Sequence, residues 1–492
     1  MSNFAGNQFM KGIDSPMDTT AYSVDTTAPF QGSSAFSAGA WALHELGFAD
    51  FNDERLTRRS VDISSRFLQH PQKSIPQSGE SWAETKAVYR FFANKKVQSK
   101  DMLKAHHRQV CIRAASLPLV LIAQDTVTLN LSGRAITGVG SIGGGTSKGL
   151  FVHTGLAIDP NGGIPIGVVT QITYARDEKT KTPEYKKKAS KLPVTEKESG
   201  RWVTTITEGK KVFEQKQLVF IGDRESDIYE VFAEAQKQGV SVLIRTKQNR
   251  ILESIGETGE KERLFTKVLT GEKIVTFEAD VPIDHHNTRK ATLTIRINQI
   301  NLLPTKRQEG QESIPVTVLN VMEENPPEGI SDPIHWMLTT SLPVTTPEEA
   351  IEKVTWYIYR WRIERFHYTL KTGAFNIEKL QFETFERFQK AITMYSIVAS
   401  RVIYTQYYEK EHPEEDAEEI FSPEEITVLC LKAKQRPRKM TVHEAVVATA
   451  RLGGFLARKN DGPPGIKSLW IGFQALQYLV EGMLLGKEAE IK

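Results

Sequence analysis

Short apolar runs in the middle of the chain predict buried strands that alternate with helices. The runs Leu117–Asp125, Gln217–Asp223 and Val240–Arg245 are rich in Val, Ile and Leu and have the length of single strands. Between them, Glu196–Glu214 and Ile228–Lys237 have the apolar spacing of helices. Together these segments predict an α/β fold class for the middle of the chain.

The pattern changes toward both ends of the chain. Residues 38–110 carry apolar and aromatic side chains at helical spacing and several arginines, and they predict a small helical domain. Residues 373–492 are expected to form a helical C-terminal domain. The core domain, 111–372, contains a stretch at about 250–345 whose β-branched residues and turn signals predict a β-rich insertion. Residues 1–37 are small and polar without a period, which is typical of a flexible extension.

Composition and charge exclude several classes of protein. The 492 residues suffice for roughly two to four domains. The net charge of +3 excludes a uniformly basic, histone-like binder but leaves local basic stretches such as 431–460. Cys111 and Cys430 are too few for a disulfide framework or a cysteine zinc site. No apolar run approaches the roughly 18 residues that span a bilayer, and no secretion signal precedes the core, so we expect a cytoplasmic protein without a membrane partner.

Two aspartates follow apolar strands and share one context. Asp125 and Asp223 each stand where a predicted buried strand ends, and the carboxyl ends of neighbouring strands meet at one edge of a sheet. Two carboxylates side by side repel each other, and a divalent cation removes that cost. The alternative is that each acid caps the following turn. Glu225 and Asp227 compete with Asp223 as ligands, although we expect Asp227 to begin the next helix.

A set of polar residues near position 360 predicts a functional stripe on a helix. At about 100° per residue, Tyr357, Arg360, Glu364 and Lys371 fall within a sector about 60° wide. The opposite face is apolar, so the stripe faces either solvent or a site. A solvated charged face is the simpler alternative. Aromatic residues beside Arg, Glu and Lys suit contacts with phosphates and bases better than contact with bulk water.

This spacing resembles a known family. The pattern Tyr357-x2-Arg360-x3-Glu364-x6-Lys371 is similar to the YREK signature of bacterial insertion-sequence transposases of the DDE class, in the family that includes the transposase of the kanamycin-resistance composite transposon. The segments Gln124–Thr126, Gly222–Asp227 and Arg451–Phe455 resemble other motifs of that family. The resemblance spans about 39–485, with the motifs in the same order.

The resemblance implies a fold and a site. The implied fold is a ribonuclease-H-like mixed sheet flanked by helices, interrupted by the β-rich insertion, with helical N- and C-terminal domains. Asp125, Asp223 and Glu364 are implied to form the DDE triad. Mg²⁺, with Mn²⁺ as a substitute, suits these oxygen ligands, and two ions per site suit phosphodiester transfer. The resemblance also implies a set of DNA-binding residues: Tyr357, Arg360, Lys371, Arg245, Lys247, Trp336, Arg55, Arg59 and Arg90.

We therefore expect a DNA transposase that binds transposon ends, cleaves them through a hairpin intermediate and joins the 3′ ends to target DNA. In that interpretation residues 38–110 bind the transposon end, and Trp336 stacks on a flipped base. Residues 373–492 form a homodimer through an apolar stripe at 466–485. Two alternatives remain, namely a catalytically silent DNA-binding descendant and a nuclease without strand transfer.

Overall fold

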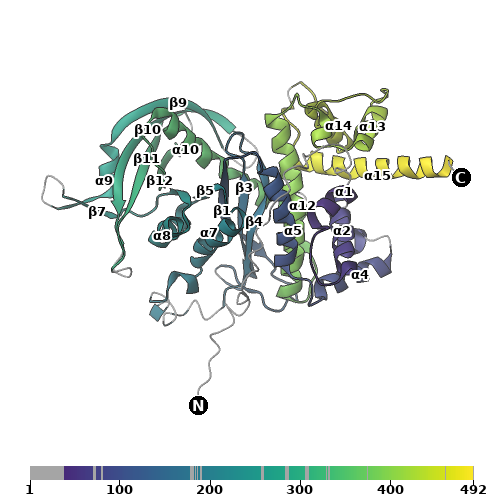
Figure 1. Cartoon of the computed structure of the whole chain (residues 1–492), viewed down its shortest axis with the longest axis horizontal. Helices are drawn as coiled ribbons and strands as arrows, with labels where there is room; N and C mark the ends of the chain where they lie inside the picture. The colour runs from purple at the N-terminus through teal and green to yellow at the C-terminus, as the bar shows by residue number, and fades with distance from the viewer. Residues whose placement is uncertain are drawn as a thin grey trace, which may run out of the picture.

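The computed structural model of the chain has a large sheet with helices packed against it (Figure 1). The structure describes residues 38–490 with gaps at 70–73, 79–80, 144, 178–181, 183, 185–186, 189–190, 256–259, 283–287, 305–309, 329, 331–332, 374 and 460. The extension expected at 1–37 lies outside the described residues. The N-terminal and C-terminal helices lie together at one end of the molecule, and the β-rich insertion lies at the other end.

One ten-stranded mixed sheet runs through the core and the insertion, in the order β2-β3-β1-β5-β6-β12-β11-β10-β9, with β4 beside β3. Its strands are β1 Leu119–Asn130, β2 Gly140–Ser141, β3 Lys148–Ile158, β4 Pro165–Tyr174, β5 Gln217–Gly222, β6 Ser241–Arg245, β9 Glu272–Pro282, β10 Thr288–Leu302, β11 Ile314–Glu324 and β12 His335–Thr340. Only β1, β5 and β6 pair in parallel. A separate hairpin pairs β7 Ile251–Ile255 with β8 Lys261–Arg263.

The insertion extends the central sheet. Strand β12 pairs antiparallel with β6, with Leu338 opposite Arg245. The stretch near 250–345, where a β-rich insertion is expected, carries β9, β10, β11 and β12, and these strands continue the hydrogen-bond ladder of the core. The mixed α/β fold with a ribonuclease-H-like sheet is thereby confirmed.

Both faces of the sheet centre are buried, which explains why the strand sequences are apolar without alternation. On β1, Leu121 and Ala123 belong to one core, whereas Val120 and Ile122 belong to a second core on the opposite face. Helices α11 and α12 contribute to the first core, and α7 and α8 contribute to the second core. Odd-numbered residues of β1 therefore face α11, and even-numbered residues face α7.

Within the described residues, helices come before, between and after the strands. In chain order they are α1 Ala38–Leu46, α2 Glu54–Gln69, α3 Ile75–Ser78, α4 Trp82–Ala93, α5 Ser99–Arg113, α7 Gly200–Val212, α8 Tyr229–Gln238, α9 Leu264–Leu269, α10 Pro347–Tyr359, α11 Trp361–Tyr368, α12 Phe385–Glu411, α13 Pro423–Lys432, α14 Val442–Leu452 and α15 Ile466–Glu490. None of these described helices combines the length and the apolar character that a membrane crossing requires.

The N-terminal helices pack against the long helix α12. Phe67 of α2 stacks on Tyr395 of α12, with ring centroids 4.2 Å apart. Ser81 caps α4 by accepting a hydrogen bond from the Glu84 backbone N–H at 3.3 Å. The Glu84 carboxylate pairs with Arg66 at 2.7 Å. This pairing ties α4 to α2.

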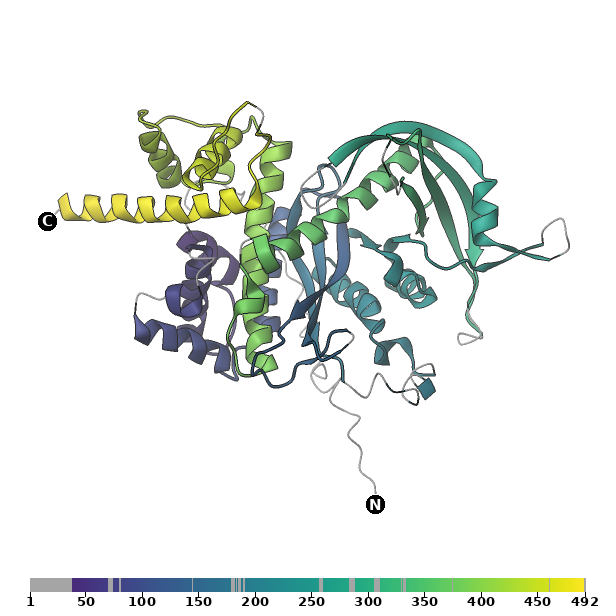
Figure 2. The same ribbon diagram turned by 180° about the vertical axis from the view of Figure 1, so that it is seen from behind.

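The last helix, α15, extends away from the body of the molecule in both views (Figure 2). Leu469, Trp470 and Leu476 in its first half are fully buried in the C-terminal domain. Leu484 and Leu485 near its end are 43% and 66% exposed. The expected apolar stripe at 466–485 is thus part core and part exposed surface.

Candidate active site

Asp125 lies on β1, and Asp223 directly follows the neighbouring parallel strand β5. The parallel pairing of β1 with β5 ends at Ala123 opposite Ile221, and each aspartate stands two residues after that pair. Both side chains therefore face the α11 side of the sheet. The prediction that β1 ends at Asp125 is wrong, because β1 continues to Asn130 by pairing with β3, where Asp125 lies opposite Thr154.

The electrostatics of the two aspartates indicate that they lie close together. Burial raises the pKa of Asp223, a backbone N–H bond opposes that shift, and the negative charge of Asp125 raises the pKa further. The Asp223 carboxylate accepts that bond from Glu225 at 2.9 Å and caps a short 3-10 turn, Arg224–Ser226. Asp223 thus caps a turn and also lies close to the carboxylate of Asp125.

Arg360 links Glu364 electrostatically to Asp125 and Asp223. Its guanidinium pairs with Glu364 of α11 at 2.7 Å, and its charge also acts on Asp125 and Asp223. Burial opposes ionisation of Asp125, but a hydrogen bond and charge from His367 and the charge of Arg360 hold its pKa below the usual range. The Nδ1 atom of His367 lies 3.6 Å from an Asp125 carboxylate oxygen. All three predicted acids are therefore within the electrostatic reach of one guanidinium.

The chemistry of these acids suits divalent cations. Asp125 and Asp223 repel each other in a largely buried place, and an ion with oxygen ligands would relieve that repulsion. Among the described residues, however, no group of three or more His, Cys, Asp or Glu side chains is arranged to hold a metal. The two aspartates fit the start of such a site, and Glu364 is engaged with Arg360.

The predicted single helix from Tyr357 to Lys371 is wrong. Helix α10 ends at Tyr359, α11 begins at Trp361, and residues Thr369–Gly373 form a π-helical turn. Because a π turn holds more residues than an α turn, the 100° spacing does not extend to Lys371. The Lys371 ammonium donates to the Thr128 carbonyl at 2.8 Å and pairs with Glu378 at 3.2 Å.

Tyr357 is also not displayed on a polar face. It is 5% exposed, and its ring meets Trp336 of β12 edge to face with centroids 5.3 Å apart. Trp336 itself is half-buried.

The predicted basic pair lies beside this tryptophan. Arg245 is the last residue of β6, and the backbone N–H of the next residue, Thr246, donates to the Met337 carbonyl at 2.7 Å. Lys247 is exposed. Because Gly222 of β5 pairs with Ile244 of β6, this end of the sheet adjoins Asp223.

Asp227 holds the loop that carries Lys247. Its side chain accepts backbone hydrogen bonds from Lys247 at 2.6 Å and Gln248 at 2.7 Å, and it pairs with Arg250 at 2.6 Å. The expectation that Asp227 begins the next helix is wrong, because α8 is preceded by Ile228 without a side-chain cap.

The N-terminal arginines are separate from the acids. Arg55 and Arg59 lie on α2 and Arg90 lies on α4, in the helical part that packs on α12 at the end of the molecule opposite the insertion (Figure 1). The Arg55 side chain is 85% exposed and pairs with Asp53 at 3.2 Å. Arg90 is exposed and Arg59 is half-buried.

Two site residues escaped the sequence reasoning. His367 lies three positions after Glu364 on α11, so helical spacing could have revealed it. Arg201 of α7 contacts Thr126, which follows Asp125, and Glu225, which donates a backbone hydrogen bond to Asp223. No local pattern signals Arg201, because its partner Thr126 lies 75 positions away in the chain.

A ribonuclease-H-like sheet with one aspartate on a strand, a second just after the neighbouring strand and a glutamate on a following helix is typical of a metal-dependent nucleic-acid enzyme. The family description "Transposase DDE domain" matches residues 141–400, more than half of the chain, so the chain belongs to the DDE transposases. Residues 38–97 match "Transposase DNA-binding" and residues 397–489 match "Transposase Tn5 dimerisation domain". These matches support a transposase of Tn5 type with DNA and a second copy of the chain as partners.

The match to the DDE domain includes Asp223 and Glu364 but begins after Asp125. The position of Asp125 as first acid therefore depends on its placement beside Asp223. Among solved structures, the chain is similar to the piggyBac transposase in a cryo-EM synaptic complex with hairpin DNA, at 7% identity and a TM-score of 0.37. That similarity covers 88% of this chain and 73% of the other.

Proposed function

We propose that this transposase cuts the ends of a mobile DNA segment with Asp125, Asp223 and Glu364 as ligands of two divalent ions, Mg²⁺ or Mn²⁺. The observation that carries the proposal is the placement of Asp125 and Asp223 at the same level of two parallel strands, with Arg360 joining them electrostatically to Glu364. Such ions, when bound, activate the attacking oxygen and stabilise the leaving oxygen of a phosphodiester.

Arg360 has two roles in this proposal. Without DNA it pairs with Glu364, which keeps a third negative charge from adding to the repulsion between the aspartates. A phosphate of the transposon end then replaces Glu364 as its partner, because guanidinium binds phosphate in the same bidentate manner as carboxylate. Glu364 becomes available as a ligand at the moment when DNA is in place. Lys371 supplies a second positive charge for the DNA backbone.

Trp336 and its neighbours handle the DNA end. In the proposed hairpin step, the free 3′-hydroxyl of the nicked end attacks the opposite strand. A new phosphodiester forms, and the bond to the 3′-oxygen of the flanking DNA breaks. Such a tight bend requires a base outside the duplex, and the half-buried ring of Trp336 offers a stacking surface. Arg245 and Lys247 lie at the same end of the sheet and would bind the bent backbone.

The remaining regions serve assembly. The exposed Arg55 and Arg90, with Arg59 between them on the same helical part, are proposed to hold phosphates of the transposon end. A second copy of the chain covers the exposed leucines near the end of α15. A dimer commits both ends before cutting, and the released 3′ ends are then joined to target DNA.

The test uses the full chain and a duplex that carries the inverted repeat flanking its gene, with Mg²⁺ present. Replacing any of the three acids by alanine is expected to lower cleavage on the order of 10³-fold or more. End binding should stay within about threefold, because these carboxylates repel phosphate. Asp280→Ala, which removes an exposed carboxylate of the insertion, is the matched control and should leave both unchanged.

The same assay separates the alternatives. Cleavage without joining to a target duplex would indicate a nuclease, and specific binding without cleavage would indicate a silent descendant. Equal loss of binding and cleavage in an acid variant would show that this acid is structural.

A further inference from the structure

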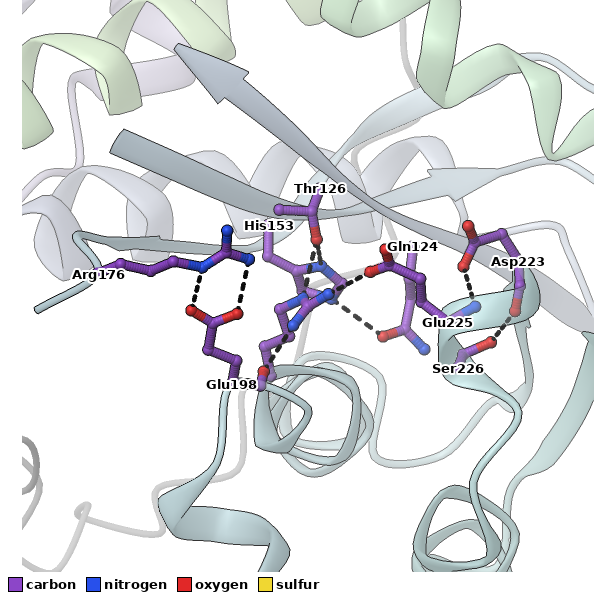
Figure 3. Close-up of polar contacts among 9 residues, drawn as sticks. Gln124, Thr126, His153, Arg176, Glu198, Asp223, Glu225 and Ser226 are labelled. Atoms are coloured by element: carbon purple, nitrogen blue, oxygen red, sulfur yellow. Dashed lines mark hydrogen bonds and ion pairs between the residues drawn. The ribbon is translucent and has the colours of Figure 1, made fainter. Parts of the chain in front are cut away.

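The two residues that flank Asp125 belong to a polar network on the opposite face of the sheet. Gln124 and Thr126 face α7, whereas Asp125 faces α11. The Thr126 hydroxyl contacts the Nδ1 atom of His153 at 2.8 Å, and the Nε2 atom of His153 lies 3.4 Å from the side-chain oxygen Oε1 of Gln124 (Figure 3). Gln124 and His153 are fully buried.

The direction of each hydrogen bond in this network follows from Arg201. The Arg201 Nε–H donates to the Thr126 hydroxyl oxygen at 2.9 Å, so the hydroxyl proton is directed at His153 Nδ1. The Nε2–H of His153 then donates to Gln124. Burial, followed by the nearby charge of Arg201, lowers the pKa of His153 and keeps the ring neutral. The chain of donors thus runs from Arg201 through Thr126 and His153 to Gln124.

Arg201 also reaches the segment of the second aspartate. Its Nη2 atom donates to the Glu225 carboxylate at 2.6 Å, and its Nη1 atom donates to the Glu198 carbonyl at 2.7 Å. Glu225 in turn donates its backbone N–H to Asp223 at 2.9 Å. The Arg201 side chain is only 10% exposed. One buried guanidinium therefore bridges the residue next to Asp125 and the residue that holds the Asp223 carboxylate.

We infer that Arg201 is a positioning residue that sets the spacing of Asp125 and Asp223 from behind the sheet. This inference rests on the proposed function of these two acids as metal ligands. Arginine suits the task because its planar fork presents donors in three fixed directions, which an ammonium cannot do. The fork keeps the two acids from separating under their mutual repulsion.

The inference predicts a specific defect when Arg201 is changed. Arg201→Met should raise the Mg²⁺ concentration that half-saturates cleavage about 10- to 100-fold, as loss of an outer-shell partner does at metal sites. Affinity for Mn²⁺, measured by electron paramagnetic resonance on the full chain without DNA, should fall by a similar factor. Binding to the end duplex should change less than about twofold, because Arg201 lies behind the acids. Arg201→Lys should be intermediate, since it keeps the charge and loses the fork.

Arg176→Met is the matched control. Arg176 pairs with Glu198, beside Arg201, and its guanidinium lies over the Phe151 ring at 4.1 Å. It contacts neither Thr126 nor Glu225 in the described structure, so its loss should leave the Mg²⁺ and Mn²⁺ dependence within about twofold of the original chain.

Several outcomes would overturn the inference. An unchanged ion dependence in Arg201→Met would do so, and so would equal losses of DNA binding, thermal stability and cleavage. If Arg201→Met does not fold, Thr126→Val keeps the side-chain shape and removes only the hydroxyl link. It should still raise the half-saturating Mg²⁺ concentration several-fold, and an unchanged value would reject the inference. Failure of the original chain to cleave would instead reject the proposed function.

Discussion

Two clusters in this molecule combine a carboxylate, a histidine and an arginine, and they differ in how well their polar groups are satisfied. In the first cluster, Glu45 of α1 receives a bond from His106 at 2.5 Å and pairs with Arg113 at 2.6 Å. The Val168 backbone N–H donates to the other ring nitrogen of His106 at 3.0 Å. In the second cluster, Asp125 lies 3.6 Å from His367 and interacts with Arg360 only through its charge.

Unpaired buried atoms in the second cluster support the proposed site. The Nε atom of Arg360 and the Nε2 atom of His367 are buried and have no hydrogen-bond partner among the described residues. In the first cluster both ring nitrogens and both carboxylate oxygens are bonded. A buried polar group costs free energy unless it is paired, so a site that keeps such groups is poised for a ligand. The same residue types thus build a fully bonded cluster at Glu45 and an incompletely bonded one at Asp125, where we propose the active site.

The largest expected difference between the clusters is in stability. Glu45→Ala leaves the buried His106 and the half-buried Arg113 without their carboxylate partner and should lower the free energy of unfolding by about 3–5 kcal/mol. Asp125→Ala removes the repulsion with Asp223 but also the attraction of His367 and Arg360, so it should change this free energy by much less than Glu45→Ala does. Urea unfolding followed by tryptophan fluorescence measures both. Similar losses in the two variants would erase the distinction.

The second test uses pH. Although burial raises it, the charge of Arg113 and hydrogen bonds from His106 and Arg113 lower the pKa of Glu45 to about 2, from an ordinary value of 4.5. A lowered folded-state pKa stabilises the protein above about pH 4.5, and this stabilisation is lost as the pH falls toward 2. The advantage of the original chain over Glu45→Gln, about 3 kcal/mol at neutral pH, should therefore shrink between pH 4.5 and 3. A difference that stays constant over this range would contradict the assignment.

The third test concerns Trp336, the tryptophan that packs against Tyr357. Trp336→Ala removes a base-stacking surface worth about 1–3 kcal/mol, so hairpin formation should fall about 5- to 100-fold while first-strand nicking is kept. Trp336→Phe retains a ring and serves as control with a smaller loss. Denaturing gels that resolve nicked and hairpin products provide the measurement. Equal loss of both steps, or loss of folding, would favour a purely structural tryptophan.

The smallest effect is expected far from both clusters. Arg90→Ala should reduce the slope of log affinity for the end duplex against log salt by about one unit, as loss of one phosphate contact does. Lys290→Ala, which removes an exposed cation of the insertion, should leave the slope unchanged. Fluorescence anisotropy across a salt series provides the comparison. An unaltered slope in Arg90→Ala would remove α4 from the proposed DNA surface.

The sequence predicts the α/β fold, and it placed Asp125, Asp223 and Glu364 where the structure brings one arginine within reach of all three. The fold prediction is confirmed because strand length and apolar content are local properties of the sequence. The roles of the three acids stay a prediction. The end of β1 was missed because its last residues are held by β3, a partner that hydrophobic patterns do not reveal. The break at Arg360 and the π turn that contains Lys371 were missed because a constant spacing of 100° per residue assumes one regular α-helix. Likewise, no spacing rule places Arg201 behind Asp125.

The pairing of β12 with β6 has a consequence for the order in which the protein can be built. Strand β6 emerges from the ribosome about 90 residues before the strand that covers its open side. Until β12 arrives, β6 presents an unpaired edge next to the segment of Asp223, and exposed edges invite pairing with other chains. Closing this contact late slows folding, because a long loop must be ordered first. A chain truncated before residue 335 would therefore be expected to aggregate rather than to persist as an inactive monomer.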